Sequence, residues 1–167
     1  MKKKLKIYLD TSVINFLYYD LAPDYKYSTI ELFENFIALE IYDTYYSVYV
    51  IDEINATPDI QKKEILLNTF IKYPLKLLEI NDLDELQNLA EKYIQKNILP
   101  EKKYLDALHI ATSVIFGIDY LISWNFRHLA NVNKERLVNA ANLENGYTKE
   151  IRIITPLELI NYETDNT

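Results

Sequence analysis

Short apolar runs and longer segments with helical periodicity alternate along the chain. The first apolar run extends from Leu5 to Leu9, is interrupted only by Lys6, and predicts a buried strand. The segment from Ser12 to Tyr19 predicts a helix whose N-cap is Thr11 or Ser12. The chain therefore begins with a strand, a turn and a helix.

The same alternation continues towards the C-terminus. Further strands are predicted at residues 44–47, 75–80, 119–124 and 151–155. Further helices are predicted at residues 27–39, 48–55, 58–73, 83–97, 100–116 and 134–144, in a short piece at 127–130, and after Pro156. Asp82 is expected to cap the helix at 83–97, and Gly117 to end the helix at 100–116.

Most of these strands are apolar on both faces, which is typical of a parallel sheet covered by helices on both sides. The chain has 167 residues, of which 49% are apolar, enough for one buried core. We therefore expect an α/β fold, a single three-layer α/β/α domain at residues 1–160, with a central, mostly parallel sheet of about five short strands. Residues 161–167 are expected to be a frayed tail.

The composition excludes several kinds of site. There is no cysteine, which rules out disulfides, thiolate metal sites and cysteine nucleophiles. The chain has only 2 glycines, too few for a glycine-rich phosphate loop. A net charge of −7 disfavours a passive nucleic-acid clamp, because lysine and arginine normally neutralise the phosphates. An acidic enzyme that binds divalent cations remains possible, since a bound metal reverses the sign of the local field.

The sequence also indicates a cytoplasmic protein without a membrane partner. The apolar run that follows the basic first residues is broken at Asp10, too early for a signal peptide. No apolar stretch reaches the length that spans a membrane. The absence of cysteine suits a reducing compartment.

Polar residues at the carboxyl ends of the strands are the candidates for chemistry, because ligands of open parallel sheets bind there. Asp10 follows the first strand, Glu53 comes after the second, and Asn125 follows the strand at 119–124. Asp106 joins them from the first turns of the helix at 100–116. Carboxylates that meet at one sheet edge repel each other unless a divalent cation lies between them. Mg²⁺ needs only one or two of them, together with water and substrate phosphate, so we expect a phosphodiester as substrate.

Each of these residues also has a purely structural explanation. Asp10 could cap the following helix, and Glu53, beside Asp52, could lie on a solvated helix face. Asp106 could be stabilised by the positive end of the helix dipole. His109 is expected to be a partly buried hydrogen-bonding residue rather than part of the site. The functional hypothesis therefore depends on the four positions occurring together.

Three segments, in this order and at this spacing, resemble the PIN-domain nucleases, which include the VapC-like toxins of toxin–antitoxin systems. They are "YLDTSVINFL", "YSVYVIDEI" and "YLDALHIATSVIFGIDYLISWNFRHLAN". The resemblance extends over roughly residues 5–155. It implies a parallel sheet with a pocket of three or four acidic residues that bind Mg²⁺ or Mn²⁺ and cleave RNA.

Carried over by position, the resemblance implies that Asp10, Glu53 and Asp106 are metal ligands and catalytic residues. The fourth acidic position of the family falls on Asn125, which brings an amide oxygen but no charge. Asp119 is not expected to replace it, since at about 3.3 Å per residue it lies about 16 Å from the end of its strand. Residues expected to support the site or to hold RNA are Thr11, Ser12, Ser123, Lys102, Lys103, Arg127 and His128.

The asparagine leaves two functions open: a Mg²⁺- or Mn²⁺-dependent endoribonuclease that acts as a toxin, or a weak or inactive PIN module that binds RNA or a protein. A phosphatase of the haloacid dehalogenase type is disfavoured, because it needs a second acid two residues after Asp10, where this chain has Ser12. The resemblance further implies RNA as substrate, a small antitoxin protein as partner, and a homodimer.

Overall fold

A five-stranded sheet lies at the centre of the molecule. The computed structural model describes residues 3–125 and 129–165, and among these every pair of neighbouring strands is parallel. The strands are β1 (Lys6–Leu9), β2 (Asp43–Tyr46), β3 (Lys76–Leu77), β4 (Tyr120–Ile122) and β5 (Arg152–Ile154). Their order in the sheet is β3-β2-β1-β4-β5. Because β1 is the middle strand, the residues that follow it lie at the centre of one sheet edge.

Helices connect the strands. They are α1 (Thr11–Phe16), α2 (Pro23–Leu32), α3 (Val48–Asn55), α4 (Ile60–Lys72), α5 (Leu83–Gln95), α6 (Tyr104–Ile115), α7 (Val132–Glu144) and α8 (Pro156–Asp165). A short π-helical segment, η1 (Phe33–Ile37), continues α2, and a 3₁₀ turn, η2 (Glu101–Lys103), precedes α6.

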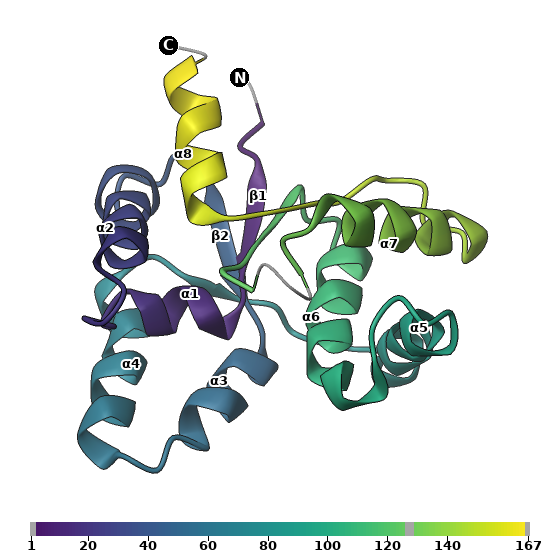
Figure 1. Cartoon of the computed structure of the whole chain (residues 1–167), viewed down its shortest axis with the longest axis horizontal. Coiled ribbons are helices and arrows are strands. Elements are labelled where there is room, and N and C mark those ends of the chain that lie inside the picture. The colour runs from purple at the N-terminus through teal and green to yellow at the C-terminus, as the bar shows by residue number, and fades with distance from the viewer. Residues whose placement is uncertain (1–2, 126–128, 166–167) are drawn as a thin grey trace.

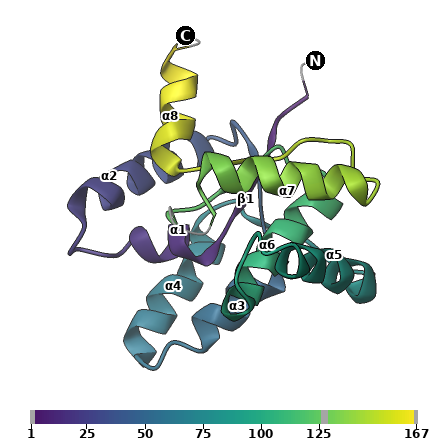
Figure 2. The same ribbon diagram turned by 45° about the vertical axis from the view of Figure 1, so that its right-hand side comes forward.

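The helices form a layer on each side of the sheet. In Figure 1, α1, α2 and α4 lie on one side of β1 and β2, and α5, α6 and α7 lie on the other. Within these layers α5 packs against α6 and α7, and α2 packs against α8. Figures 1 and 2 both show the two termini at one end of the molecule and α3 and α4 at the opposite end. The carboxyl ends of β1 and β2 point towards α3.

The core explains why the sheet is stable. All of Ile7, Tyr8 and Leu9 in β1 are fully buried, as is Leu121 in β4. α6 is unusual among the helices because eight consecutive residues, from Ala107 to Val114, are buried. The two elements on which the candidate site depends most, β1 and α6, are therefore also the most deeply buried.

The structure confirms the expected α/β fold with five parallel strands. It also differs from the sequence prediction in detail. The strand predicted at 75–80 is reduced to Lys76–Leu77, because it lies at the sheet edge and both side chains are exposed. The helix predicted at 27–39 already begins at Pro23, a residue that suits the first helical position because it lacks an N–H.

The ends of two other predicted helices can be compared in the same way. The helix predicted at 100–116 is α6 preceded by the turn η2, and Gly117, at φ +62°, follows it in the left-handed conformation expected after a helix. α8 extends to Asp165 and thus includes much of the segment predicted as a tail. The helical piece predicted at 127–130 begins outside the described residues. No helix in the described part of the chain is long and apolar enough to cross a membrane.

Candidate functional site

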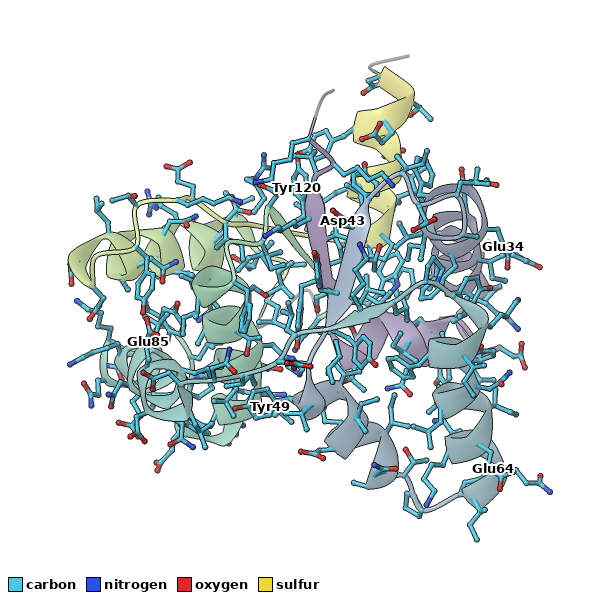
Figure 3. The ribbon with its side chains drawn as sticks, turned by 180° about the vertical axis from the view of Figure 1, so that it is seen from behind. Glu34, Asp43, Tyr49, Glu64, Glu85 and Tyr120 are labelled. Carbon is cyan, nitrogen blue, oxygen red and sulfur yellow. The ribbon has the colours of Figure 1, made fainter. Side chains whose placement is uncertain are left out.

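A small cavity of about 240 Å³ opens at the carboxyl ends of the strands. The residues that line it are Asp10, Thr11, Ser12, Asn15, Glu53, Lys103, Asp106, His109 and Asn125. Larger hollows lie along α7 and beside α5, but they are away from the carboxyl ends of the central strands. Because parallel sheets bind ligands beyond these ends, the smaller cavity is the candidate site. Figure 3 shows Asp43 and Tyr120, the first residues of β2 and β4, at one end of the sheet. Tyr49 of α3 lies at the other end.

Asp10 is fixed both as a helix cap and as a wall of this cavity. Its Oδ1 accepts hydrogen bonds from the backbone N–H groups of Ser12 and Val13, at 3.0 and 3.4 Å, and so caps α1. Only 4% of Asp10 is exposed. The same carboxylate therefore caps α1 and lines the cavity.

Two serines hold the Asp10 carboxylate from the side. The hydroxyl of Ser12 donates to Oδ1, and that of Ser123 donates to Oδ2. The same hydroxyls accept backbone N–H groups, Ser12 from Trp124 and Ser123 from Asn125, each at 2.9 Å. The end of β1 and the loop after β4 are thereby joined through the Asp10 side chain.

Glu53 reaches the cavity from α3 rather than from the end of a strand. Its Oε1 accepts a hydrogen bond from Thr11 Oγ1 at 2.5 Å and lies 2.7 Å from His109 Nε2. These are the hydrogen bonds of the Glu53 carboxylate among the described residues, and both use Oε1. The second oxygen, Oε2, takes part in neither of them.

Asp106 lies in the first turn of α6, as the sequence predicts. Its Oδ2 accepts a hydrogen bond from Asn125 Nδ2 at 3.3 Å and lies 4.0 Å from Lys103 Nζ. Asn125 thus contacts one of the acidic residues directly, while Ser123 supports Asp10 and accepts only the backbone N–H of Asn125.

Burial raises the pKa of two of the three carboxylates, those of Asp10 and Asp106. It raises the pKa of Asp10 above its usual value, and the charge of Asp106 adds to this shift. Burial also raises the pKa of Asp106, opposed mainly by the positive charge of Lys103 and increased by the charge of Glu53. A cation bound between these groups would relieve both effects.

Glu53 behaves differently. Burial alone would raise its pKa, but the interactions with His109 outweigh it, and the hydrogen bond from Thr11 adds to them. The pKa of Glu53 is therefore lower than usual, and this carboxylate is ionised at neutral pH.

The structure assigns His109 a larger part than the sequence indicates. The ring is only 2% exposed, yet it lines the cavity and contacts Glu53. Its other nitrogen, Nδ1, lies 2.6 Å from the hydroxyl of Tyr8. Asn15, which also lines the cavity, was not a candidate either. Its place one helical turn after Thr11, on the same face of α1, is the signal that could have identified it.

The remaining candidates lie at different places. Lys103 lines the cavity, whereas Lys102 is exposed on η2 and does not line it. Arg127 and His128 lie outside the described residues. Asp119 directly precedes β4, so it lies at the amino ends of the strands, away from the cavity. There it accepts a hydrogen bond from the backbone N–H of Lys6 and forms an ion pair with Lys149.

The donor atoms suit a hard divalent cation such as Mg²⁺ or Mn²⁺, which prefers oxygen ligands. Three carboxylate side chains and two asparagine side chains line the cavity. In the described part of the chain, no three His, Asp or Glu side chains form a group that could hold a metal ion by themselves. Mg²⁺ keeps several waters and needs only one or two carboxylates, so the residues fit a cation that is held by part of the set together with water.

The solved structures that are similar to this fold include two VapBC complexes. One is the complex of VapBC2 from Rickettsia felis bound to a DNA fragment from its promoter, with a TM-score of 0.55 and 14% sequence identity over 90% of this chain and 98% of the matching chain. The other is DNA-bound VapBC from Salmonella typhimurium, with a TM-score of 0.54 and 13% identity over 91% of this chain and 98% of the matching chain. No family model matches the sequence, and no curated protein matches it either.

The order of parallel strands, the two helix layers and these similarities define the class of the fold. The chain has a PIN fold. More narrowly, its fold is VapC-like, because the matched structures are VapBC complexes and almost the whole of each matching chain is covered.

Proposed function

We propose that this chain is a divalent-metal-dependent endoribonuclease, the toxin of a toxin–antitoxin pair. The observation that carries the proposal is the meeting of three carboxylates, from the end of β1, from α3 and from α6, at one cavity of a VapC-like PIN fold. The segments that hold them are far apart in the sequence. A purely structural role for each would not require all three to line the same cavity.

In this proposal Mg²⁺ or Mn²⁺ would be held by carboxylates from among Asp10, Glu53 and Asp106, together with bound water. When bound, the cation supplies Lewis-acid polarisation of the phosphodiester and lowers the pKa of a water molecule. Ser12 and Ser123 hold the carboxylate of Asp10 in one orientation. Lys103 lines the cavity, and in this proposal its ammonium group would contact a substrate phosphate.

The test is an RNA cleavage assay with the purified protein. An unstructured RNA oligonucleotide is incubated with the protein and Mn²⁺, with Mg²⁺, or with EDTA, and the products are separated by size. We expect shortened RNA with either metal and intact RNA with EDTA. Intact RNA under all conditions would contradict the proposal.

Asn125 is the reason to keep the second candidate, a PIN module that binds RNA or a protein without cleaving. The amide donates to Asp106, where a carboxylate would instead repel it and add a negative charge. In the assay above, RNA that binds in a gel-shift experiment but is not cleaved with any metal would favour this second function.

Replacing Asn125 by aspartate is expected to strengthen Mn²⁺ binding, on the order of tenfold, because ligand charge tunes cation affinity. Without metal the same variant should unfold at a lower temperature, since the hydrogen bond to Asp106 is lost and two carboxylates face each other. Thermal unfolding with and without Mn²⁺ measures both effects. Asn145→Asp, on the exposed end of α7, is the control with the same added charge. An equal Mn²⁺-dependent rise for both variants would contradict the prediction.

The antitoxin belongs to the same proposal. The matched structures are VapBC complexes bound to DNA, and by analogy we propose a small protein partner for this chain, and a homodimer of the chain itself. Expression of the chain alone is expected to arrest bacterial growth, and expression of its antitoxin should relieve the arrest.

A further inference from the structure

We infer that Tyr8, buried in the middle of the sheet, is a positioning residue for the candidate site and acts through His109 on Glu53. The inference depends on the proposed metal site, and it concerns the groups behind that site rather than its ligands. It starts from a polar chain that crosses the core between β1, α3 and α6.

The contacts form a continuous path. The Tyr8 hydroxyl lies 2.7 Å from Ser47 Oγ and 2.6 Å from His109 Nδ1. On the other side of the ring, His109 Nε2 lies 2.7 Å from Glu53 Oε1. A group at the centre of the sheet is thus connected to the cavity in two hydrogen bonds.

The burial of Tyr8 makes this arrangement more than a packing choice. Tyr8 is 0% exposed and stands in β1 between two fully buried apolar residues, Ile7 and Leu9. A phenylalanine would fill the same volume, whereas a buried hydroxyl costs free energy unless it is fully hydrogen-bonded. The tyrosine is therefore explained by the hydrogen bonds of its hydroxyl with Ser47 and His109.

Ser47 supports the same conclusion. It stands at the N-cap of α3, where a serine usually accepts a hydrogen bond from the first turn of the helix. Here its side chain makes no capping hydrogen bond. Its hydroxyl forms a hydrogen bond with Tyr8 instead. The helix that carries Glu53 therefore lacks a side-chain cap, and Ser47 is part of the hydrogen-bonded path.

The chemistry of the groups sets the direction of the path. An ionised carboxylate only accepts hydrogen bonds, so Nε2 of His109 must donate to Glu53. In a neutral ring Nδ1 is then an acceptor, and the Tyr8 hydroxyl donates to it while accepting from Ser47. Tyr8 thereby holds the ring in one tautomer and one orientation.

The effect at the cavity follows from how Glu53 is held. His109 and Thr11 both bind Oε1, and Oε2, which takes no part in these hydrogen bonds, would be the oxygen that binds the cation. Loss of the Tyr8 hydroxyl would free the ring to turn or to change its tautomer, and Glu53 would lose its fixed orientation. Groups of this kind behind a metal ligand are typically worth 10–100-fold in metal affinity or activity, and we expect about tenfold here.

The experiment compares Tyr8→Phe with the wild type by Mn²⁺ titration without RNA, following free Mn²⁺ by electron paramagnetic resonance. We expect the Kd for Mn²⁺ to rise by about tenfold. The matched control is Tyr93→Phe, which removes another fully buried hydroxyl, the one that donates to Asn142, away from the cavity. The control should lose stability with an unchanged Kd. An equal Kd for Tyr8→Phe and the wild type, or an equal loss in both variants, would overturn the inference.

A second variant tests whether Tyr8 acts through His109. Glutamine at position 109 carries an amide N–H that can donate to Glu53 without help from Tyr8. In the His109→Gln background, Tyr8→Phe should therefore change the Kd by less than twofold, whereas additive effects of the two substitutions would overturn the inference. The ¹⁵N chemical shifts of the His109 ring in the metal-free protein give an independent measurement. One tautomer is expected in the wild type and a mixture in Tyr8→Phe.

These results are separable from those on the proposed function. A wild-type protein that binds Mn²⁺ but cleaves no RNA would contradict the nuclease proposal, while the Kd values of the variants would still decide the role of Tyr8. A wild-type protein that cleaves RNA, together with an unaffected Tyr8→Phe variant, would overturn only the positioning role.

Discussion

Replacing Asp106 by asparagine is expected to lower the rate of metal-dependent RNA cleavage by at least about 100-fold, because even groups behind a metal ligand cost about 10–100-fold. The substitution keeps the shape of the side chain and removes its charge. Cleavage of a labelled RNA at saturating Mn²⁺ measures the effect. The fold should not suffer, because burial raises the pKa of Asp106 and its ionised form is a cost to the folded state at neutral pH.

The chain offers a matched control at the amino ends of the strands, opposite the cavity. Asp119 is also largely buried, with 24% of its side chain exposed against 18% for Asp106, and it also has a lysine partner. Asp119→Asn should cleave RNA at the wild-type rate. If both variants lose cleavage equally, the loss comes from general electrostatics and the assignment of Asp106 is wrong.

The second large effect concerns stability. Replacing Leu121 by alanine is expected to lower the free energy of unfolding by roughly 2–5 kcal/mol, because the substitution would leave a new, empty void in the closely packed core. Leu121 is fully buried in β4, between β1 and β5. Chemical denaturation followed by circular dichroism gives the value directly.

An exposed leucine provides the comparison. Leu21 is 83% exposed, in the segment between α1 and α2. Leu21→Ala removes the same atoms and should change the free energy of unfolding by no more than about 0.5 kcal/mol. A similar loss in both variants would mean that β4 is not part of the core.

Much of the fold follows from the sequence, and the exceptions have physical causes. The buried strands β1, β4 and β5 are apolar runs with clear ends, so periodicity predicts them well. β3 is an edge strand of two exposed residues, and its pairing depends on β2 rather than on its own pattern. The start of α2 depends on Pro23, whose meaning is clear only once the helix is seen to begin there.

The candidate site was predictable to the extent that a single rule applies. Asp10 follows the central strand, and Asp106 begins a buried helix, so both are found from element ends. Glu53 is different, since it lies in the second turn of α3 and reaches the cavity through the placement of that helix. The strand-end rule and the resemblance to PIN-domain nucleases both predict Glu53, although this residue lies in a helix and not at the end of a strand.

The position of His109 at the cavity and its hydrogen bonds could not be predicted from the sequence. Its partners, Tyr8 and Glu53, are 101 and 56 residues away in the sequence, and only the packing of β1, α3 and α6 brings them together. A histidine on an apolar helix has the same local pattern whether it is a packing residue or a connection between two polar groups. The roles of Asp10, Glu53, Asp106 and Asn125 in chemistry stay predictions for the experiments above.

The deep burial of α6 has a consequence for how firmly each wall of the cavity is held. Asp106 is attached to a helix with eight consecutive buried residues, and Asp10 directly follows a strand that is almost completely buried. Glu53 is attached to a helix of eight residues in which only Val50 and Ile54 are buried. Two walls of the cavity are therefore anchored in the core, and the third is anchored by fewer buried residues. We expect α3 to move more than β1 or α6 when ligands of different size bind.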